Sequence, residues 1–432
     1  MEKRTVFEGN QIQDQITYRE ENPRFALMGQ NAAGQRLAWA ISEEMLSRHM
    51  LLIGGIGTGK SNVFYHLIRN IRETVGPKDV MFIFDTKGDY YKKFYRPGDI
   101  VLSNDSRACG PAGKDYWNLF NEVMIDDRLE ENIMEACKTL FAEKTERTNQ
   151  PFFPNAAKDL LYALILHICR SPRGRDKRDN GSLRAALNDF SPRVMCDILK
   201  AYPDLKAMVS YIEDPSSPQT LGVASELQEA VREVLVGNFA RRGTLSMRDI
   251  VRRKGGRVVF VEYDLSIGGT LSPVYRLLFD FAIKQALCRQ EDEGNVFFLL
   301  DEFRLLPLLQ HIDDGVNFGR SLGAKFIVGV QNIEQMEHAY GRELARSILA
   351  GFATTVCFRL NDGGSRAFVK EMLGKNVTKL TFVSSVQNRG VVEQLRDANV
   401  AEDWDITSLG LGDAIVNYAQ YPPFRIHFNR FS

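Results

Sequence analysis

Residues 54–61 read GGIGTGKS, between the apolar run Met50–Ile53 and the segment NVFYHLIRNIRETV at 62–75. The apolar residues of that segment recur at helical spacing, at Val63, Phe64, Leu67, Ile68 and Ile71. The eight residues therefore connect a strand to a helix, which is the context that the pattern G-x-x-x-x-G-K-[ST] requires of a phosphate-binding loop. This stretch predicts an α/β fold with a nucleotide bound at the turn.

The chemistry of such a loop assigns a role to each residue type. Glycines let the backbone curl so that several N–H groups point at phosphate oxygens, and the helix start adds a partial positive charge. We expect Lys60 to neutralise the β- and γ-phosphates of ATP and the Ser61 hydroxyl to hold Mg²⁺. The predicted nucleotide contacts are Gly54, Gly55, Ile56, Gly57, Thr58, Gly59, Lys60, Ser61 and Asn62. The alternative, a chance match, is made rarer by the flanking strand and helix.

A second motif, VFFLLDEF, ends an apolar run with two acidic residues, Asp301 and Glu302. Ligands of open α/β sheets gather at the carboxyl ends of the strands, so both residues are expected beside the loop. Asp301 is predicted to hold Mg²⁺ through water, and Glu302 to polarise the water that attacks the γ-phosphate. Acidic residues also end many strands with no catalytic role, which is the alternative interpretation.

The stretch GRSLGAKFIVGVQN, at 319–332, carries two further candidates. Gln331 follows the strand predicted at Phe326–Val330, so it is expected at the nucleotide edge, where it would sense the γ-phosphate or position the attacking water. Arg320 precedes that strand and is expected at the opposite edge. A catalytic Arg320 would therefore have to act on the ATP of a neighbouring subunit, which implies a ring. A backbone-contacting glutamine and a surface arginine are the alternatives.

Elsewhere, short apolar runs alternate with helical patterns at both ends of the chain. Besides Met50–Ile53 and Phe326–Val330, strands are predicted at Phe25–Met28, Val80–Phe84, Ile100–Leu102, Val258–Tyr263, Val296–Leu300, Thr354–Phe358 and Ala414–Tyr418. Runs without alternation suit strands of a parallel sheet that is buried on both faces. A helix is predicted to open at Pro273, because proline favours the first helical position.

Between about Val123 and Thr244 the strand signals vanish and helices alternate with turn-forming segments. Helices are predicted at Glu130–Ala142, Asn155–Arg170, Ser182–Asp189, Pro192–Lys200 and Pro218–Val236. We therefore predict a discontinuous nucleotide-binding domain, 1–122 with 245–432, around an all-α inserted domain at 123–244.

Several other polar residues are weaker candidates. Asp85, Lys87 and Asp89 in IFDTKGDY, and Arg359 after ATTVCF, are expected near the nucleotide edge, where they would contact nucleotide or DNA or be purely structural. Trp117 is predicted to pack in the core rather than to stack on a base. Basic residues cluster at Arg170–Arg178 and at Arg241, Arg242, Arg248, Arg252, Arg253, Lys254 and Arg257. Solvated faces explain most such clusters, and phosphate contact is the alternative.

Composition excludes several classes of protein. The 432 residues are 44% apolar and 25% charged, which is typical of globular proteins and not of disordered or fibrous ones. Lys plus Arg equals Asp plus Glu at 55 each, so any nucleic-acid contact must use local patches. The cysteines, Cys109, Cys137, Cys169, Cys196, Cys288 and Cys357, form no CxxC pair, which favours reduced thiols in a cytosolic protein. No signal peptide or bilayer-length apolar segment is recognised.

Taken in order, these motifs resemble the type IV secretion coupling ATPases, the TraG/TraD/TrwB family of conjugation. The resemblance runs from about Phe25 to the C-terminus and rests on GGIGTGKS, FDTKGDY, DYWNLF, PFFPNAAKDLL, RGTLSMRDIV, LLDEF and GRSLGAKFIVGVQN. It implies a RecA-like P-loop motor with a central, mostly parallel sheet and an all-α inserted domain. It also places the family's trans-acting arginine on Arg320 and its glutamine on Gln331.

The resemblance further implies a homo-hexameric ring that moves DNA, single- or double-stranded, or a nucleoprotein relaxase complex toward the components of a secretion channel. Candidate DNA contacts are Arg170–Arg178, Lys375, Lys379 and Arg389. Most family members begin with two transmembrane helices. Because no such segment is recognised in this sequence, we expect a cytoplasmic protein at the inner face of the membrane. It would be either a natural variant held there by a partner or a trimmed form.

Two other functions stay open. A DNA translocase of the HerA/FtsK type, or the other conjugation-channel ATPase, shares the motor and serves another process. A nucleotide-gated receptor would dock substrate proteins through the helical insert without translocation. Asp301 and Glu302 argue against the receptor, because a binding module needs no hydrolytic base.

Overall fold

The computed structural model describes residues 3–104, 115–288, 293–383, 391–419 and 421–432. The chain forms two compact units. Unit 1 comprises Met1–Val75, Phe297–Arg304 and Val316–Ser432, and unit 2 comprises Gly76–Val296 and Leu305–Gly315.

A mixed sheet is the framework of unit 1, with strands in the order β3-β2-β14-β13-β10-β4-β9-β8. Its parallel part contains β4 (Met50–Ile53), β9 (Ala324–Val330) and β10 (Thr354–Cys357), with β4 hydrogen-bonded in parallel to both neighbours. β8 (Val296–Leu300) lies beside β9. Every residue of these strands is buried. β4 and β8 appear in the sequence as uninterrupted apolar runs, whereas β9 contains Lys325 and β10 begins with Thr354 and Thr355.

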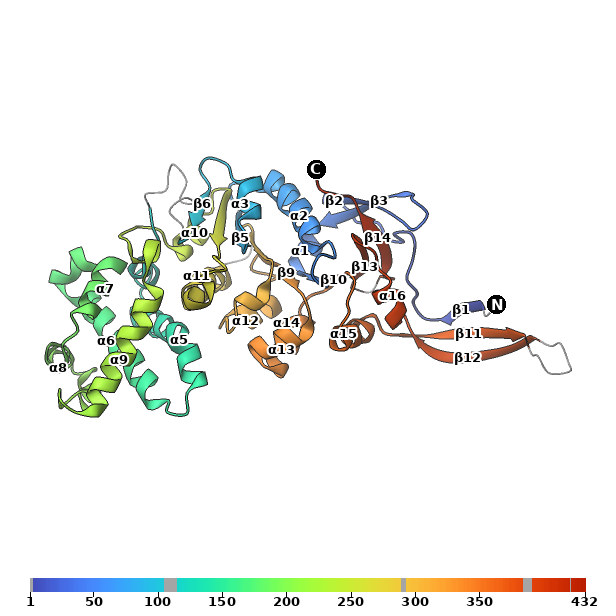
Figure 1. Ribbon diagram of the computed structural model, residues 1–432. Helices are drawn as coiled ribbons and strands as arrows, with labels where there is room; N and C mark the ends of the chain where they lie inside the picture. The colour runs from blue at the N-terminus through green and yellow to red at the C-terminus, as the bar shows by residue number, and fades with distance from the viewer. Residues whose placement is uncertain (1–2, 105–114, 289–292, 384–390, 420) are drawn as a thin grey trace. The chain divides into compact units, whose positions relative to one another are not determined.

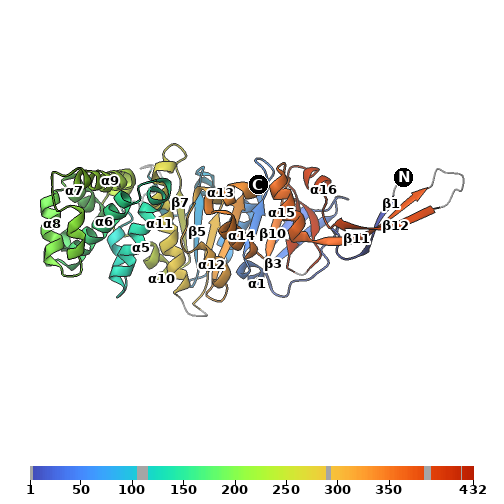
Figure 2. The same cartoon turned by 90° about the horizontal axis from the view of Figure 1, so that it is seen from below.

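The rest of this sheet is antiparallel. β13 (Asp413–Tyr418) pairs with β10, and β14 (Phe424–Phe428), β2 (Pro23–Gln30) and β3 (Arg36–Ser42) follow it. The expectation of a central, mostly parallel sheet is confirmed, with the antiparallel strands gathered at one end of the strand order. A separate antiparallel sheet joins β1 (Lys3–Glu8), β11 (Lys375–Val383) and β12 (Val391–Asn399), and it projects from unit 1 (Figure 2).

Helix α2 (Lys60–Thr74) buries the face predicted from its sequence, because Val63, Phe64, Leu67, Ile68 and Ile71 are all inaccessible to solvent. A Cβ on Gly329 of β9 would lie 2.9 Å from Phe64, so the glycine lets α2 pack closely on the sheet. The other helices of unit 1 are α1 (Glu43–Ser47), α13 (Ile333–Tyr340), α14 (Arg342–Ala350), α15 (Gly363–Leu373) and α16 (Asp403–Thr407). Helices α13, α14 and α15 lie side by side (Figure 1).

Unit 2 contains three parallel strands in the order β5-β7-β6, which are β5 (Val80–Asp85), β7 (Arg257–Glu262) and β6 (Ile100–Leu102). Its shorter helical segments are α3 (Asp89–Phe94), α4 (Leu119–Val123), α10 (Met247–Arg253) and the 3₁₀ turns η1 (Pro172–Lys177), η2 (Lys206–Tyr211) and η3 (Gly237–Ala240). η4 (Phe303–Leu305) and α12 (Ile312–Phe318) each cross between the units along the chain.

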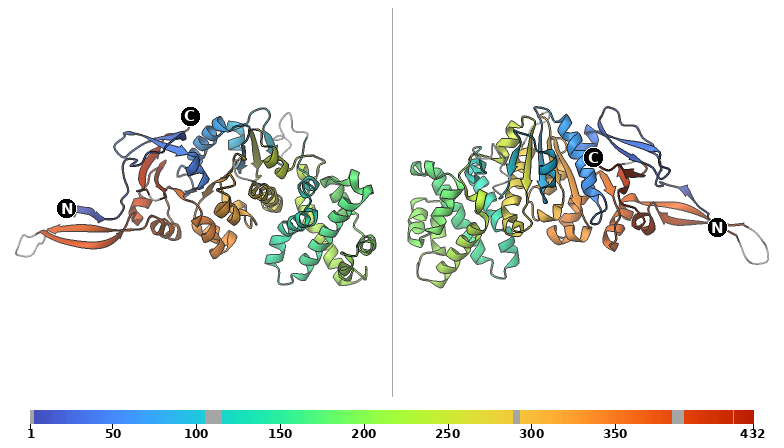
Figure 3. Two further views of the ribbon diagram at one scale, coloured as in Figure 1. Left: turned by 180° about the vertical axis from the view of Figure 1, so that it is seen from behind. Right: turned by 45° about the horizontal axis from the view of Figure 1, so that its top comes forward.

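The stretch 123–244, all of which is described, contains helices and no strand. Its long helices are α5 (Leu129–Arg147), α6 (Phe152–Arg170), α7 (Asn180–Asn188), α8 (Pro192–Ala201) and α9 (Pro218–Val234). Each lies within a few residues of its predicted range. Helix α6 packs against α5 and against α9. These helices form the teal-to-green part of Figure 3.

The predicted start of a helix at Pro273 is wrong. Helix α11 runs from Gly268 to Leu287 and contains Pro273 in its second turn. A proline at this point removes one hydrogen bond, to the carbonyl of residue 269 in the exposed first turn, where the loss costs little. In the described part of the chain, no helix combines the length and the apolar character that a bilayer crossing requires.

Candidate active site

The loop at 54–61 is fixed to the ends of two neighbouring strands. Gly54 N–H donates to the Val330 carbonyl at the end of β9 (3.2 Å), and Gly55 N–H donates to the Arg359 carbonyl just after β10 (3.0 Å). Within the loop, the Thr58 hydroxyl donates to the Gly55 carbonyl at 2.8 Å. The loop therefore starts from a fixed position at the carboxyl edge of the parallel strands.

Two glycines of the loop are required for different reasons. A Cβ on Gly54 would lie 2.5 Å from the Cβ of Phe358, so only glycine fits at that point. Gly59 has φ +120°, a conformation that L side chains rarely adopt, and a Cβ there would lie 3.1 Å from Gly412 Cα. The glycines at the two ends of the loop thus allow a close approach of the backbone to neighbouring segments.

The start of α2 has the properties of an anion site. The first N–H groups of a helix lack partners within the helix, and here the residue at the cap, Gly59, has no side chain to accept from them. Ile56 is 84% exposed, and open space surrounds the position of a Cβ on Gly57. A phosphate group would therefore find N–H donors and room at the top of this loop.

Lys60, the first residue of α2, folds over the loop and is 7% exposed. Its ammonium donates to the carbonyl of Gly54 and, at 3.1 Å, to that of Gly55. The loop therefore already carries a positive charge at its centre, which is where the phosphates of a nucleotide need one.

Ser61 and Asp301 bring two oxygens together below the loop. The Ser61 hydroxyl lies 3.4 Å from Asp301 Oδ2, and Asp301 Oδ1 accepts from the Glu302 N–H at 3.0 Å. Asp301 is buried at the end of β8. One carboxylate and one hydroxyl are the kind of oxygen ligands with which Mg²⁺ is held alongside substrate phosphates, so the pair fits this ion.

Glu302 is held by Gln331. The Gln331 side-chain amide donates to both carboxylate oxygens of Glu302, at 2.8 and 2.7 Å. Arg304 lies 3.8 Å from the same carboxylate. Glu302 has φ +57°, which is unusual for a residue with a side chain and typical of sites where function over-rides backbone preference. The structure thus joins two of the predicted catalytic residues directly.

Arg320 lies at the other edge of the sheet. Its guanidinium is 3.5 Å from Glu44 of α1, which precedes β4, and both side chains are more than half exposed. The loop at 54–61 follows β4, and Gln331 follows β9, the strand that Arg320 precedes. Arg320 is therefore separated from the loop of its own chain by the length of a strand.

A family model described as the type IV secretion-system coupling protein DNA-binding domain matches residues 38–395. The chain belongs to this family.

Two curated relatives are described as coupling proteins of the same secretion system. The chain is 22% identical over 360 residues to the type IV secretion system-coupling protein VirD4 of Bartonella henselae, which covers 78% of this chain and 56% of that protein. For VirD4 of Bartonella quintana the identity is 23% over 340 residues, with 76% and 50% covered. The chain thus spans about half the length of the curated relatives it matches.

Among solved structures, the plasmid coupling protein TrwB in complex with ADP and Mg²⁺ has a TM-score of 0.75 at 18% identity, covering 100% of this chain and 95% of that chain. VirB4 of Thermoanaerobacter pseudethanolicus has a TM-score of 0.60 at 13% identity, covering 96% and 98%. The likeness to TrwB shows the fold, an α/β RecA-like P-loop fold.

Among the other predicted contacts, Asn62 is directed elsewhere. Its side chain donates to the carbonyl of Asn429 (2.9 Å) and accepts from the N–H of Phe431 (2.7 Å). Any contact of Asn62 with a nucleotide would therefore have to come from its backbone N–H.

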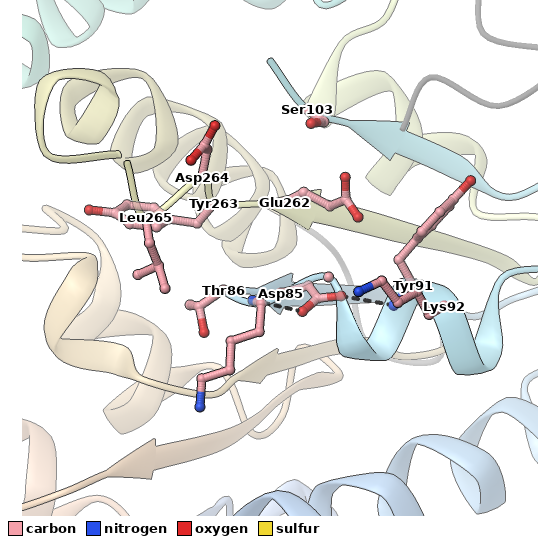
Figure 4. Close-up of a pocket in the computed structure, with 11 residues that line it drawn as sticks. Asp85, Thr86, Tyr91, Lys92, Ser103, Glu262, Tyr263, Asp264 and Leu265 are labelled. Carbon is pink, nitrogen blue, oxygen red and sulfur yellow. Dashed lines mark hydrogen bonds between the residues drawn. The ribbon is translucent and has the colours of Figure 1, made fainter. Parts of the chain in front are cut away.

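Asp85 and Lys87 line a cavity of about 580 Å³ in unit 2, at the carboxyl ends of β5 and β7 (Figure 4). Asp85 is buried, and burial raises the pKa of its carboxyl group. It accepts from the N–H groups of Lys87 (3.3 Å) and Tyr91 (2.8 Å), so it fixes the turn that leads into α3. Glu262 and Asp264 complete the acidic side of this cavity. The structure therefore gives Asp85 a structural role, and Asp89 is the first residue of α3.

Trp117 is buried, as predicted, and donates to Glu122 at 2.8 Å. Glu122, which no sequence motif indicated, is fully buried and also accepts from Ser246 Oγ (2.8 Å) and from the N–H groups of Met247 and Arg248. Burial raises the pKa of its carboxyl group. Glu122 therefore binds the end of α4 to the start of α10, residues that lie on either side of the helical stretch.

The basic clusters are partly used inside the protein. Arg170 pairs with Glu130 and Asp204, Arg178 donates to the Cys169 carbonyl, and Arg248 is buried against Asp126. Lys379 pairs with Glu393. Arg389 and Cys109 lie outside the described residues.

Proposed function

We propose that this chain is the motor portion of a coupling protein, which hydrolyses ATP in a ring of identical subunits and uses the energy to move DNA or a nucleoprotein complex into a secretion channel. The observation that carries the proposal is the convergence at one sheet edge of the loop at 54–61, the Ser61–Asp301 pair and the Glu302–Gln331 pair. This combination supplies a phosphate cradle, cation ligands and a base, which is the set that phosphoryl transfer to water requires.

In this proposal each residue has one task. The N–H groups of Gly57, Thr58, Gly59, Lys60 and Ser61 bind phosphate oxygens, with Gly54, Gly55 and Ile56 shaping the loop, and the Lys60 ammonium leaves the loop carbonyls to face the γ-phosphate. Ser61 and Asp301 hold Mg²⁺, which when bound offsets the negative charge of the phosphates. Glu302 accepts a proton from the attacking water, and Gln331 controls the position of the Glu302 carboxylate. TrwB, the protein of similar fold, is described in complex with ADP and Mg²⁺ and in complex with an ATP analogue.

The ring follows from the position of Arg320. Transition-state stabilisation by an arginine requires contact with the transferred phosphoryl group, and such residues raise the rate by about 10³–10⁵. Arg320 lies a strand length from the loop of its own chain, so only a neighbour in a head-to-tail ring can use it. A hexamer is the ring that we propose.

The domain division is also a proposal, with the motor formed by 1–122 and 245–432 and the helical insert by 123–244. The insert would contact the transported substrate, and the motor would act at the inner face of the cell membrane beside the channel. The family description supports DNA as a substrate through local basic surface, because the net charge of the chain is zero.

ATP turnover with and without single- and double-stranded DNA, at several protein concentrations, tests this proposal. We expect turnover that rises with protein concentration and rises further with DNA. A rate of ATP turnover that does not change when DNA is added would favour another channel ATPase. ATP binding without turnover at any protein concentration would favour a nucleotide-gated receptor.

A further inference from the structure

A second cavity, of about 520 Å³, lies within the helical insert of unit 2. Helices α6, α7 and α8 and the turn η1 line it. Its size is within the range of pockets that hold small molecules or a few side chains of a peptide. None of the residues assigned above to the binding or hydrolysis of ATP lines this cavity.

The floor of this cavity is apolar. Leu164 and Ile168 come from α6, and Val194, Met195 and Ile198 come from α8. Leu164, Ile168 and Met195 are buried, whereas Val194 is 57% exposed at the mouth. A helix that shows an aliphatic side chain at the mouth of an apolar cavity offers a place for the apolar side chain of a partner.

The rim of the cavity carries two exposed cations, Arg173 and Lys177, both on η1. In the described part of the chain neither of them forms an ion pair, and Asp189 is the acidic residue among those that line the cavity. The pKa of His167 is lowered by burial and by the charge of Lys177, so this side chain is neutral near pH 7. The rim therefore has a net positive charge.

A close backbone contact fixes the turn that carries these two residues. A Cβ on Gly174, between Arg173 and Lys177, would lie 2.2 Å from the carbonyl oxygen of Ile168, so only glycine lets η1 approach α6 this closely. The Gly174 N–H donates to the Ser171 carbonyl at 3.0 Å. The cationic rim is thus fixed to the helix that forms the floor.

We propose that this cavity is a docking site for a protein segment that carries apolar side chains next to carboxylates. The apolar floor takes the side chains, and Arg173 and Lys177 pair with the carboxylates. Nucleic acid is disfavoured, because a duplex presents phosphates but no aliphatic group to fill the floor. The inference deepens the proposed coupling role by specifying the chemistry of its partner, and it does not depend on ATP turnover.

Fluorescence anisotropy with the full chain tests this inference. The probes are three labelled peptides with the same leucine positions, in which the intervening residues are all glutamate, all lysine or all serine. We expect the glutamate peptide to bind at least tenfold more tightly than the lysine peptide at low salt, and its affinity to fall as salt is added. Equal binding of the two charged peptides would overturn the proposal.

Variants locate the site. Val194→Glu is expected to lower the affinity for the glutamate peptide at least tenfold. Leu221→Glu, at a side chain 58% exposed on α9, is expected to leave this affinity unchanged. Arg173→Glu with Lys177→Glu should reverse the preference toward the lysine peptide, a gain that an unfolded protein cannot show, and Lys206→Glu is the matched control.

ATP turnover of these variants is measured in parallel. An absence of ATP turnover, which would count against the proposed motor, is then distinguished from an absence of peptide binding, which would count against the docking site. Unchanged binding in Val194→Glu would overturn the assignment. The assignment would also be overturned if a short DNA duplex bound through Arg173 and Lys177 and the glutamate peptide did not bind.

Discussion

The side-chain amide of Gln331 donates to both carboxylate oxygens of Glu302, at 2.8 and 2.7 Å. The two residues follow neighbouring strands, β9 and β8, and meet at the edge that carries the loop at 54–61. An amide that engages both oxygens holds the carboxylate in one place. Each carboxylate oxygen keeps a further lone pair, so Glu302 can accept a proton from water while Gln331 sets the position of its carboxylate.

Replacing Glu302 with glutamine should therefore separate binding from chemistry. Glu302→Gln removes the base and leaves Lys60, Ser61 and Asp301 in place. We expect ATP affinity within a few-fold of the original and turnover lower by about 10²–10⁴. Phosphate release and binding of a fluorescent ATP analogue measure the two effects. Glu343→Gln, at an exposed position on α14, is the control, and retained turnover in Glu302→Gln would remove Glu302 from the catalytic role.

Replacing Gln331 with glutamate places a second carboxylate against Glu302. Like charges disfavour ionisation, so the deprotonated base should be harder to form in this variant. Because the base acts in its deprotonated form, the acid limb of the pH–turnover profile should move to higher pH. The profile of Gln331→Ala, which adds no charge, should not move in this way. An identical acid limb in Gln331→Glu and the original chain would contradict the contact.

Asp280 in α11 predicts a pH dependence of stability. Burial raises the pKa of its carboxyl group to about 7, although charges and hydrogen bonds from His311 and Gln310 oppose the shift. A carboxyl with a raised pKa in the folded state favours folding when protonated, so its contribution is lost as the pH rises from about 4 through 7. Neighbouring His311 has a pKa that burial lowers but that Glu135 and Asp280 raise overall.

Asp280→Asn keeps an acceptor for the Gln310 and His311 N–H groups and carries no charge. We expect this variant to be more stable than the original chain at pH 8, by up to a few kcal/mol, and close to it at pH 5. Chemical denaturation at both pH values measures the difference. A stability difference that is the same at pH 5 and pH 8 would rule out Asp280 as its source.

The sequence predicted the parallel part of the fold because those strands are buried on both faces. Of the antiparallel strands in this sheet, β2 and β13 were predicted, whereas β3 and β14 were missed. In β14, FRIHF, Arg425 and His427 interrupt the buried apolar residues, and the apolar run Leu37–Ile41 of β3 was not assigned to a strand. The missed strands β1, β11 and β12 form the small separate sheet, whose residues in β12 are mostly exposed.

The candidate site was predictable as a set of residues at one edge, because each follows a buried strand. Its contacts were not. Neither the positive φ of Glu302 nor its bond with Gln331, 29 residues away, is revealed by a sequence. Glu122 and Asp280 were missed because their partners are distant in sequence, at Met247 and at Gln310, and an isolated acidic residue gives no sign of its burial.

The central claim is that Arg320 acts on the nucleotide of a neighbouring subunit. The seven residues of β9 separate Arg320 from Gln331, a span of roughly 20 Å, far beyond the reach of one side chain. Lys60→Ala removes the positive charge of the loop, and Arg320→Ala removes the proposed trans-acting group, so each variant alone should be nearly inactive. Arg346→Ala, which removes an exposed arginine on α14, is the control.

The most direct measurement is ATP turnover by a mixture of Lys60→Ala and Arg320→Ala subunits. Mixed rings contain interfaces that pair an intact Lys60 site on one subunit with an intact Arg320 on the next. We predict partial recovery of turnover that follows the fraction of such interfaces as the mixing ratio is varied. No recovery at any ratio, in a sample in which mixed rings are shown to form, would contradict the account.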